Sequence, residues 1–148
     1  MDEEFLERVK KIKEIRMKEL FAVIKSSGKT ELLEKFGVVL LQNQMIEENL
    51  RNLIKYSNSK NGVTAKLNLD VTFGKLIYLF EQYVIRIEKY DYLYELLEEC
   101  RSLRNTLIHN IFEIEYFFDI VEVVDECITV EEKILEELDM YWIKIEEN

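Results

Sequence analysis

Apolar and polar residues recur along most of this chain with the period of an α-helix. Residues 2–26 carry an apolar stripe formed by Phe5, Val9, Ile12, Leu20 and Val23. Residues 30–57 carry a second stripe, formed by Phe36, Val39, Ile46, Leu50 and Leu53. Both patterns predict long amphipathic helices, with Gly28 as the C-terminal cap of the first. Asn43 falls inside the second stripe, where it either hydrogen-bonds within the bundle or lines a site.

The second half of the chain divides at a few loop and capping signals. Residues 57–62 form a loop, and the linker continues to Asp70 with a weakly alternating segment at 63–69. Thr72 opens a helix expected at 72–88, whose aromatic residues belong to the core. Asp91 is a good N-cap for a helix at 91–112. The capping-box pattern that begins at Thr129 predicts two further helices, at 114–128 and 130–146.

Length and composition favour one all-α domain over residues 1–148, an up-and-down helical bundle with a long second connection. Proline is absent and glycine occurs four times, so little interrupts the helices. No apolar run is long enough for a membrane span, and the N-terminus does not resemble a signal peptide. We therefore expect a cytoplasmic protein with reduced Cys100 and Cys127, and neither a cofactor nor a metal site.

The net charge of −10 argues against a general nucleic-acid coat protein, but the charge is uneven. Residues 113–148 hold 13 acids and two lysines, whereas the remaining residues hold 17 acids and 18 bases. The acidic excess therefore belongs to the C-terminal region. The basic residues of 2–26 alternate with glutamates and are better explained as a solvated face than as an RNA-binding patch.

The helix at 91–112 carries the only histidine of the chain. Its apolar seam consists of Leu93, Leu96, Cys100, Leu103 and Leu107. Arg101, Arg104, Asn105 and His109 spread over a polar arc of roughly 140° beside that seam. Asn105 and His109 are i and i+4 neighbours, whereas Arg104 and His109 are about 140° apart on an ideal helix.

The stretch Leu103-Arg104-Asn105-Thr106-Leu107-Ile108-His109-Asn110, in an all-helical chain, resembles the HEPN family of small helical ribonucleases. The signature of that family is an arginine, four to six residues and a histidine, usually with a polar residue after the arginine. Asn105 occupies that polar position. The resemblance covers residues 30–125, although its specific part is the arginine–histidine element.

The resemblance implies metal-independent cleavage of single-stranded RNA by its own 2′-hydroxyl. His109 would take the hydroxyl proton, Arg104 would stabilise the charge growing on phosphorus, and Asn105 would orient the phosphate or the imidazole. Arg101 would contribute to substrate binding. The products would be a 2′,3′-cyclic phosphate and a 5′-hydroxyl.

The resemblance also implies partners. Family members act as homodimers whose two motifs face one cleft, and many are toxins neutralised by an antitoxin such as a minimal nucleotidyltransferase. An apolar strip of Tyr94, Leu97 and Ile108 beside the polar arc is the expected dimer interface. Some relatives carry a modifiable tyrosine two residues after the histidine, where this chain has Ile111.

A non-catalytic helical module for protein–protein interaction is the alternative. It would account for the acidic C-terminal region, and Arg104 and His109 would then belong to a partner surface.

Overall fold

The computed structural model describes residues 2–26, 30–62, 67–85, 91–109 and 117–146. These residues form α1 (Glu3–Ser26), α2 (Thr30–Lys60), α3 (Phe73–Phe80), the π-helical turn η1 (Glu81–Ile85), α5 (Asp91–His109) and α6 (Phe117–Glu146). The described residues contain no strand, so the expectation of an all-α helical bundle is confirmed. Parts of the expected elements lie outside the described residues: the cap Gly28, residues 63–66 of the extended segment, residues 86–88 and 110–112 at the ends of two expected helices, and residues 114–116 at the start of a third.

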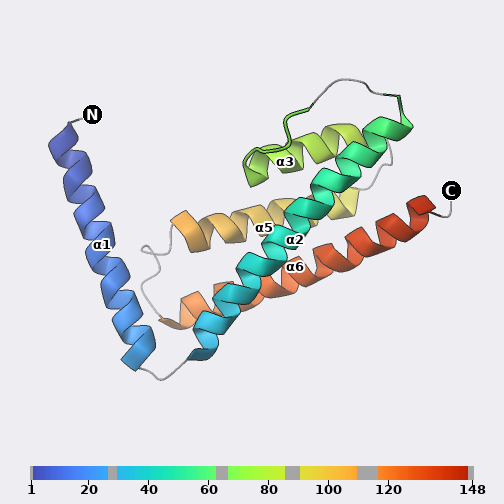
Figure 1. Ribbon diagram of the computed structural model, residues 1–148. Coiled ribbons are helices and arrows are strands. Elements are labelled where there is room, and N and C mark those ends of the chain that lie inside the picture. Colours follow the sequence, from blue (N-terminus) through green and yellow to red (C-terminus); the bar gives the residue numbers. More distant parts are fainter. Residues whose placement is uncertain (1, 27–29, 63–66, 86–90, 110–116, 147–148) are drawn as a thin grey trace.

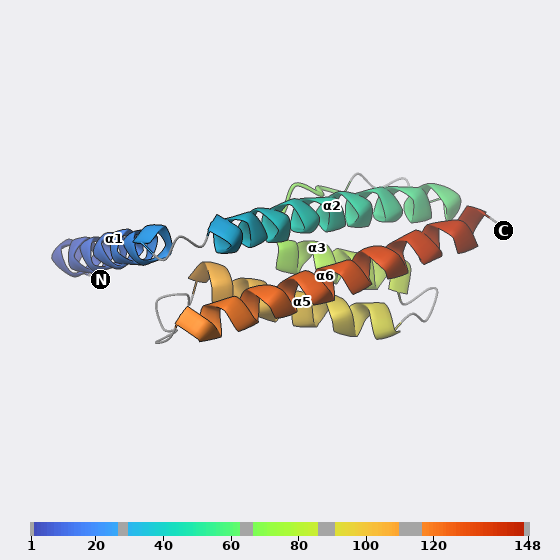
Figure 2. The same cartoon turned by 90° about the horizontal axis from the view of Figure 1, so that it is seen from below.

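The helices α2, α3, α5 and α6 pack together as the bundle (Figures 1 and 2). The chain after α2 returns to the region where α2 begins its second half, so α3 runs in the same direction as α2. The hydrogen bonds from Arg51 to Leu69 O and from Ser57 to Tyr83 O agree with this parallel arrangement. α5 then runs in the opposite direction, and α6 runs beside α2 in the direction of α2.

The apolar stripes of the sequence meet in one large core and one smaller cluster. The large core joins α2, α3, η1, α5 and the second half of α6, and its most buried side chains include Leu53, Phe80 and Leu97. The smaller cluster joins the beginnings of α2 and α6 to Leu107. Leu103 contacts both groups, so α5 links the two halves of the bundle.

The helix α3 begins directly after its N-cap residue, Thr72. Thr72 has an extended backbone, and its hydroxyl accepts a hydrogen bond from Lys75 N at 3.4 Å. This bond satisfies one of the N–H groups that a helix start leaves without a partner. Phe73 and Phe80 are buried in the core as expected, whereas Tyr78 of the same helix is 48% exposed.

The expected break in the C-terminal region is wrong, because α6 is a single helix from Phe117 to Glu146. Thr129 does not cap a new helix: its hydroxyl donates to Asp125 O at 3.0 Å, one turn earlier. This local bond lets a threonine sit in a helix interior. Val130 and Ile134, which follow Thr129, are buried in the core and hold the helix continuous.

The prediction that Leu97 belongs to an exposed apolar strip at a dimer interface is also wrong, because this side chain is 0% exposed. All the seam residues are buried except Leu103, which is half-buried. Leu97 joins them in the core because α5 packs against α6 on one side and α3 and η1 on the other. Tyr94 packs against the same core, and the side chain of Ile108 lies outside the described side chains.

The helix α1 stands apart from the bundle (Figures 1 and 2). It approaches the bundle where α1 ends and α2 begins, and its described side chains are exposed or half-buried. None of the helices in the described part of the chain combines the length and apolar character needed to cross a membrane.

Candidate functional site

Arg104 extends from α5 into the junction of four helices rather than along the surface of α5. Its Nη1 donates to Glu47 Oε1 of α2 at 3.3 Å. Its guanidinium carbon lies 5.0 Å from the centre of the Phe73 ring on α3, which is a cation–π distance. The Arg104 side chain is 28% exposed, so part of it remains open to solvent.

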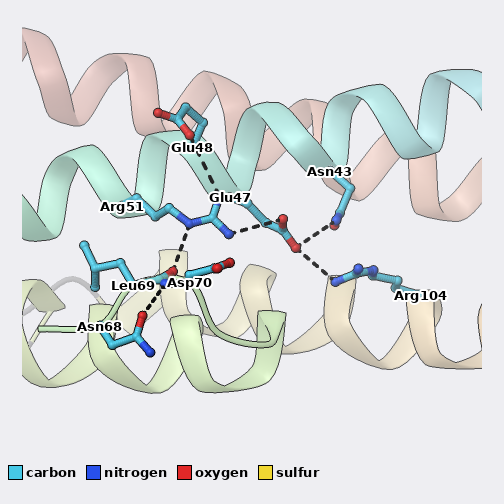
Figure 3. A network of polar contacts seen from close by, with 8 residues as sticks. All are labelled: Asn43, Glu47, Glu48, Arg51, Asn68, Leu69, Asp70 and Arg104. Atoms are coloured by element: carbon cyan, nitrogen blue, oxygen red, sulfur yellow. Dashed lines mark hydrogen bonds and ion pairs between the residues drawn. The ribbon is translucent and has the colours of Figure 1, made fainter.

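The Glu47 carboxylate is the centre of a polar network on α2 (Figure 3). Oε1 accepts hydrogen bonds from Arg104 and from Asn43 Nδ2, the latter at 3.4 Å. Oε2 pairs with Arg51 Nη2 at 3.7 Å, and Arg51 Nε donates to Leu69 O at 3.0 Å. One carboxylate therefore orients two guanidinium groups and ties α2 to α5 and to the segment before α3.

Two roles were expected for Asn43: a hydrogen bond within the bundle or a place in the lining of a site. The structure favours the hydrogen bond within the bundle. Asn43 is 5% exposed and donates to Glu47, while its Oδ1 has no hydrogen-bond partner among the described residues. Although only the Nδ2 group of the Asn43 amide is hydrogen-bonded, that bond helps to orient the Glu47 carboxylate, which accepts from Arg104.

A buried carboxyl and two thiols lie on the α6 side of the same junction. Cys100 and Cys127 are both buried and reduced, and the Cys100 thiol hydrogen-bonds to Cys127. This hydrogen bond and burial raise the pKa of Cys100, so the thiol stays protonated. Burial also raises the pKa of Glu131 from 4.5 to about 9, with Cys127 adding to the shift and Arg104 opposing it.

Glu131 is the most unusual group of the bundle. It is 0% exposed, and neither carboxyl oxygen has a hydrogen-bond partner among the described residues. A carboxylate without a partner is very costly inside a protein, so this group stays neutral near pH 7. Arg104 is therefore balanced by Glu47 and not by Glu131.

The other candidate residues lie in different surroundings. Arg101 forms a two-pronged ion pair with Glu98, at 2.8 and 3.1 Å, and its aliphatic part lies 3.4 Å from where a Cβ on Gly74 would stand. Asn105 is exposed on α5, away from the Glu47 network. His109 is the last residue of α5, and its side chain lies outside the described side chains.

Glu47 and Arg51 were not predicted as site residues, although their spacing in the sequence contains a signal. Asn43, Glu47 and Arg51 are spaced by four residues, so they share one line along α2 beside its apolar stripe. A polar line of this kind on a core helix marks a network of polar contacts. For Glu131, the signal was its place between the buried positions Val130 and Ile134.

Within the described residues, no group of three or more histidine, cysteine and acidic side chains is arranged to hold a metal ion. Comparison of the chain with family models, curated proteins and solved structures gives no significant match. The functional assignment therefore depends on the arginine–histidine element and its surroundings.

Proposed function

We propose that this protein is a metal-independent endoribonuclease of the HEPN type, which cleaves single-stranded RNA. The observation that carries the proposal is the element Arg104-Asn105, three residues and His109, at the end of one helix of an all-α bundle. The network around Glu47 adds support, because it fixes the arginine side chain in one direction.

In the proposed reaction, His109 removes the proton of the RNA 2′-hydroxyl. The 2′-oxygen attacks the adjacent phosphorus, the bond from phosphorus to the 5′-oxygen breaks, and that oxygen takes a proton from the solvent, to which His109 later releases its own. A 2′,3′-cyclic phosphate and a 5′-hydroxyl result. Arg104 stabilises the charge on the phosphoryl oxygens, and Asn105 orients the phosphate or the imidazole.

Glu47 acts as a positioning residue for Arg104 in this proposal. A guanidinium has five N–H donors in a fixed plane, so a bond from Nη1 to Glu47 leaves donors that suit a phosphate. The stacking of the guanidinium on Phe73 restricts the same plane from a second side. A preorganised donor needs little rearrangement as charge develops.

The direct test is cleavage of single-stranded RNA by the purified protein in excess EDTA. We expect activity to persist, the products to end in a 2′,3′-cyclic phosphate and a 5′-hydroxyl, and DNA of the same sequence to remain intact. DNA lacks the 2′-hydroxyl that serves as the nucleophile. Loss of cleavage in EDTA, or products with a 3′-hydroxyl, would contradict the mechanism.

A second prediction concerns where RNA lies on the protein. The helix α6 carries ten acids and two lysines, so like-charge repulsion opposes RNA there. We expect photocrosslinks from bound RNA to concentrate on α5 and to avoid the exposed face of α6. Crosslinks that fall mainly on α6 would show that the charge argument fails.

The resemblance adds two partner proposals. The first is a homodimer that brings two arginine–histidine elements to one cleft, which supplies a second histidine for the acid–base cycle. The second is that the protein is a toxin, neutralised by an antitoxin such as a minimal nucleotidyltransferase. A pull-down from the native source with the full chain tests both partners at once.

A non-catalytic helical interaction module is the second candidate. It is favoured by the ion pair that already occupies Arg104 and by the exposed apolar side chains of α1 and α2. Under this function, purified protein would bind a partner protein and leave every tested RNA uncut.

A further inference from the structure

Two helix faces of this chain are apolar and lie open. On α1, Phe5, Ile12 and Ile15 are each more than half exposed. On α2, the face opposite the core presents Leu33, Val38, Leu40, Leu41 and Met45, of which Leu41 is 60% exposed. Single exposed apolar residues are ordinary, but two stripes at helical spacing, of which that on α1 is interrupted by Arg8, mark surfaces that bind a partner.

The two stripes match one another in length. Phe5 and Ile15 are ten positions apart on α1, and Leu33 and Met45 are twelve positions apart on α2, roughly 15 and 18 Å at the rise of an α-helix. They do not meet within one chain, because α1 points away from the bundle (Figures 1 and 2).

Their charges are complementary as well. The helix α1 holds seven basic and five acidic residues, a net charge of +2. At residues 30–48 of α2, Glu31, Glu34 and Glu48 are exposed and Lys35 is half-buried. The fourth glutamate, Glu47, is paired with Arg104 and Arg51. Opposite charge beside matched apolar stripes favours pairing of α1 with α2 over pairing of α1 with α1.

The exposed surface area of this chain is also larger than that of a compact monomer, as expected if a dimer buries part of it. A compact monomer of 17.8 kDa exposes roughly 8,000 Å², and this chain exposes 10141 Å². The excess is about 2,000 Å² per chain, or roughly 4,000 Å² for two chains, within the range of obligate homodimer interfaces.

We propose that two copies of this chain exchange their first helices, so that the apolar stripe of α1 in each copy covers the outer face of α2 in the other. The exchange is symmetric, since each copy supplies one α1 and one α2 face. It does not depend on the arginine–histidine element, so it stands or falls independently of ribonuclease activity.

The first test is light scattering of the full chain at micromolar concentration. We expect twice the chain mass, and we expect Ile12→Glu or Leu41→Glu to weaken dimerisation by roughly a hundredfold or more, because each change acts at two equivalent contacts. Ile143→Glu is the matched control, since Ile143 is exposed on α6 and lies outside both stripes. A monomeric wild-type chain, or equal weakening by the control, would overturn the proposal.

The second test separates exchange from other dimers and from folding of α1 onto its own α2. A photocrosslinking amino acid replaces Ile12 in chains with and without ¹⁵N, and the two preparations are mixed. We expect crosslinked peptides that join α1 of one isotope to residues 33–45 of the other. Crosslinks confined to one isotope, or directed to another helix, would refute the exchange.

Discussion

Replacing His109 by alanine is expected to lower the rate of RNA cleavage by roughly a hundredfold or more, because it removes the proposed general base. Arg104→Ala should lower it by a similar factor through loss of charge stabilisation on phosphorus. The measurement is the single-turnover rate on a single-stranded RNA in EDTA. Arg8→Ala is the control for loss of an arginine, since Arg8 pairs with Glu4 on the exposed surface of α1.

Arg104→Ala is also expected to affect the stability of the fold. Arg104→Ala removes the ion pair with Glu47 and the contact with Phe73, so some loss of thermal stability should accompany it. Arg104→Lys keeps a charge near Glu47 but loses the planar fork. We expect it to recover stability more than activity. Equal recovery of both would mean that Arg104 serves the fold alone.

Glu47→Gln separates positioning from stability in the same assay. The amide still accepts from Asn43 and Arg104 but no longer carries the charge that holds the guanidinium. We expect a decrease in the rate smaller than that of Arg104→Ala, with substrate affinity affected less than turnover. Cleavage unchanged in every variant, including His109→Ala, would point to a contaminating nuclease and favour the interaction module.

Glu131→Gln is expected to stabilise the protein at pH 7 by on the order of 3 kcal/mol. The folded protein holds this carboxyl with a pKa of about 9, against 4.5 for an ordinary glutamate. Below about pH 4.5 the carboxyl is protonated in both the folded and the unfolded state, so its ionisation does not change the free energy of unfolding. As the pH rises toward 9 only the unfolded chain releases the proton, so the stability of the wild-type protein falls relative to the variant.

The measurement is the free energy of unfolding in denaturant for both proteins from pH 4 to pH 9. The difference should be small at pH 4 and should grow by about 1.4 kcal/mol per pH unit above 4.5. Glu132→Gln is the matched control, since the neighbouring Glu132 is exposed. A difference that stays constant across this range would show that Glu131 is not held neutral by burial.

The helical class and the starts of most helices follow from the sequence alone. The apolar periodicity located α1, α2 and α5, although α2 continues to Lys60, into the expected loop. Thr72 was correctly identified as an N-cap, whereas α6 was expected as two helices. These features are local: capping bonds and stripes involve residues within a few positions of each other, so the pattern carries them. The capping-box pattern at Thr129 gave a wrong prediction because a threonine hydroxyl can either accept from a later N–H group, as an N-cap, or donate to an earlier carbonyl. Only the packing of Val130 and Ile134 decides between these two hydrogen bonds.

The contacts of the α5 side chains, in contrast, depend on tertiary packing and could not be predicted from the sequence. An ideal helix placed Leu97 outside the seam, but α3 and η1 cover that side, so the residue is buried. The helical wheel placed Arg104 on a polar arc at the edge of the seam, whereas its guanidinium contacts Glu47, 57 residues away in the chain. A helical wheel gives the direction in which a side chain leaves its helix. Which other helices lie in that direction depends on long-range packing. That packing placed Arg104 beside Glu47 and buried Glu131.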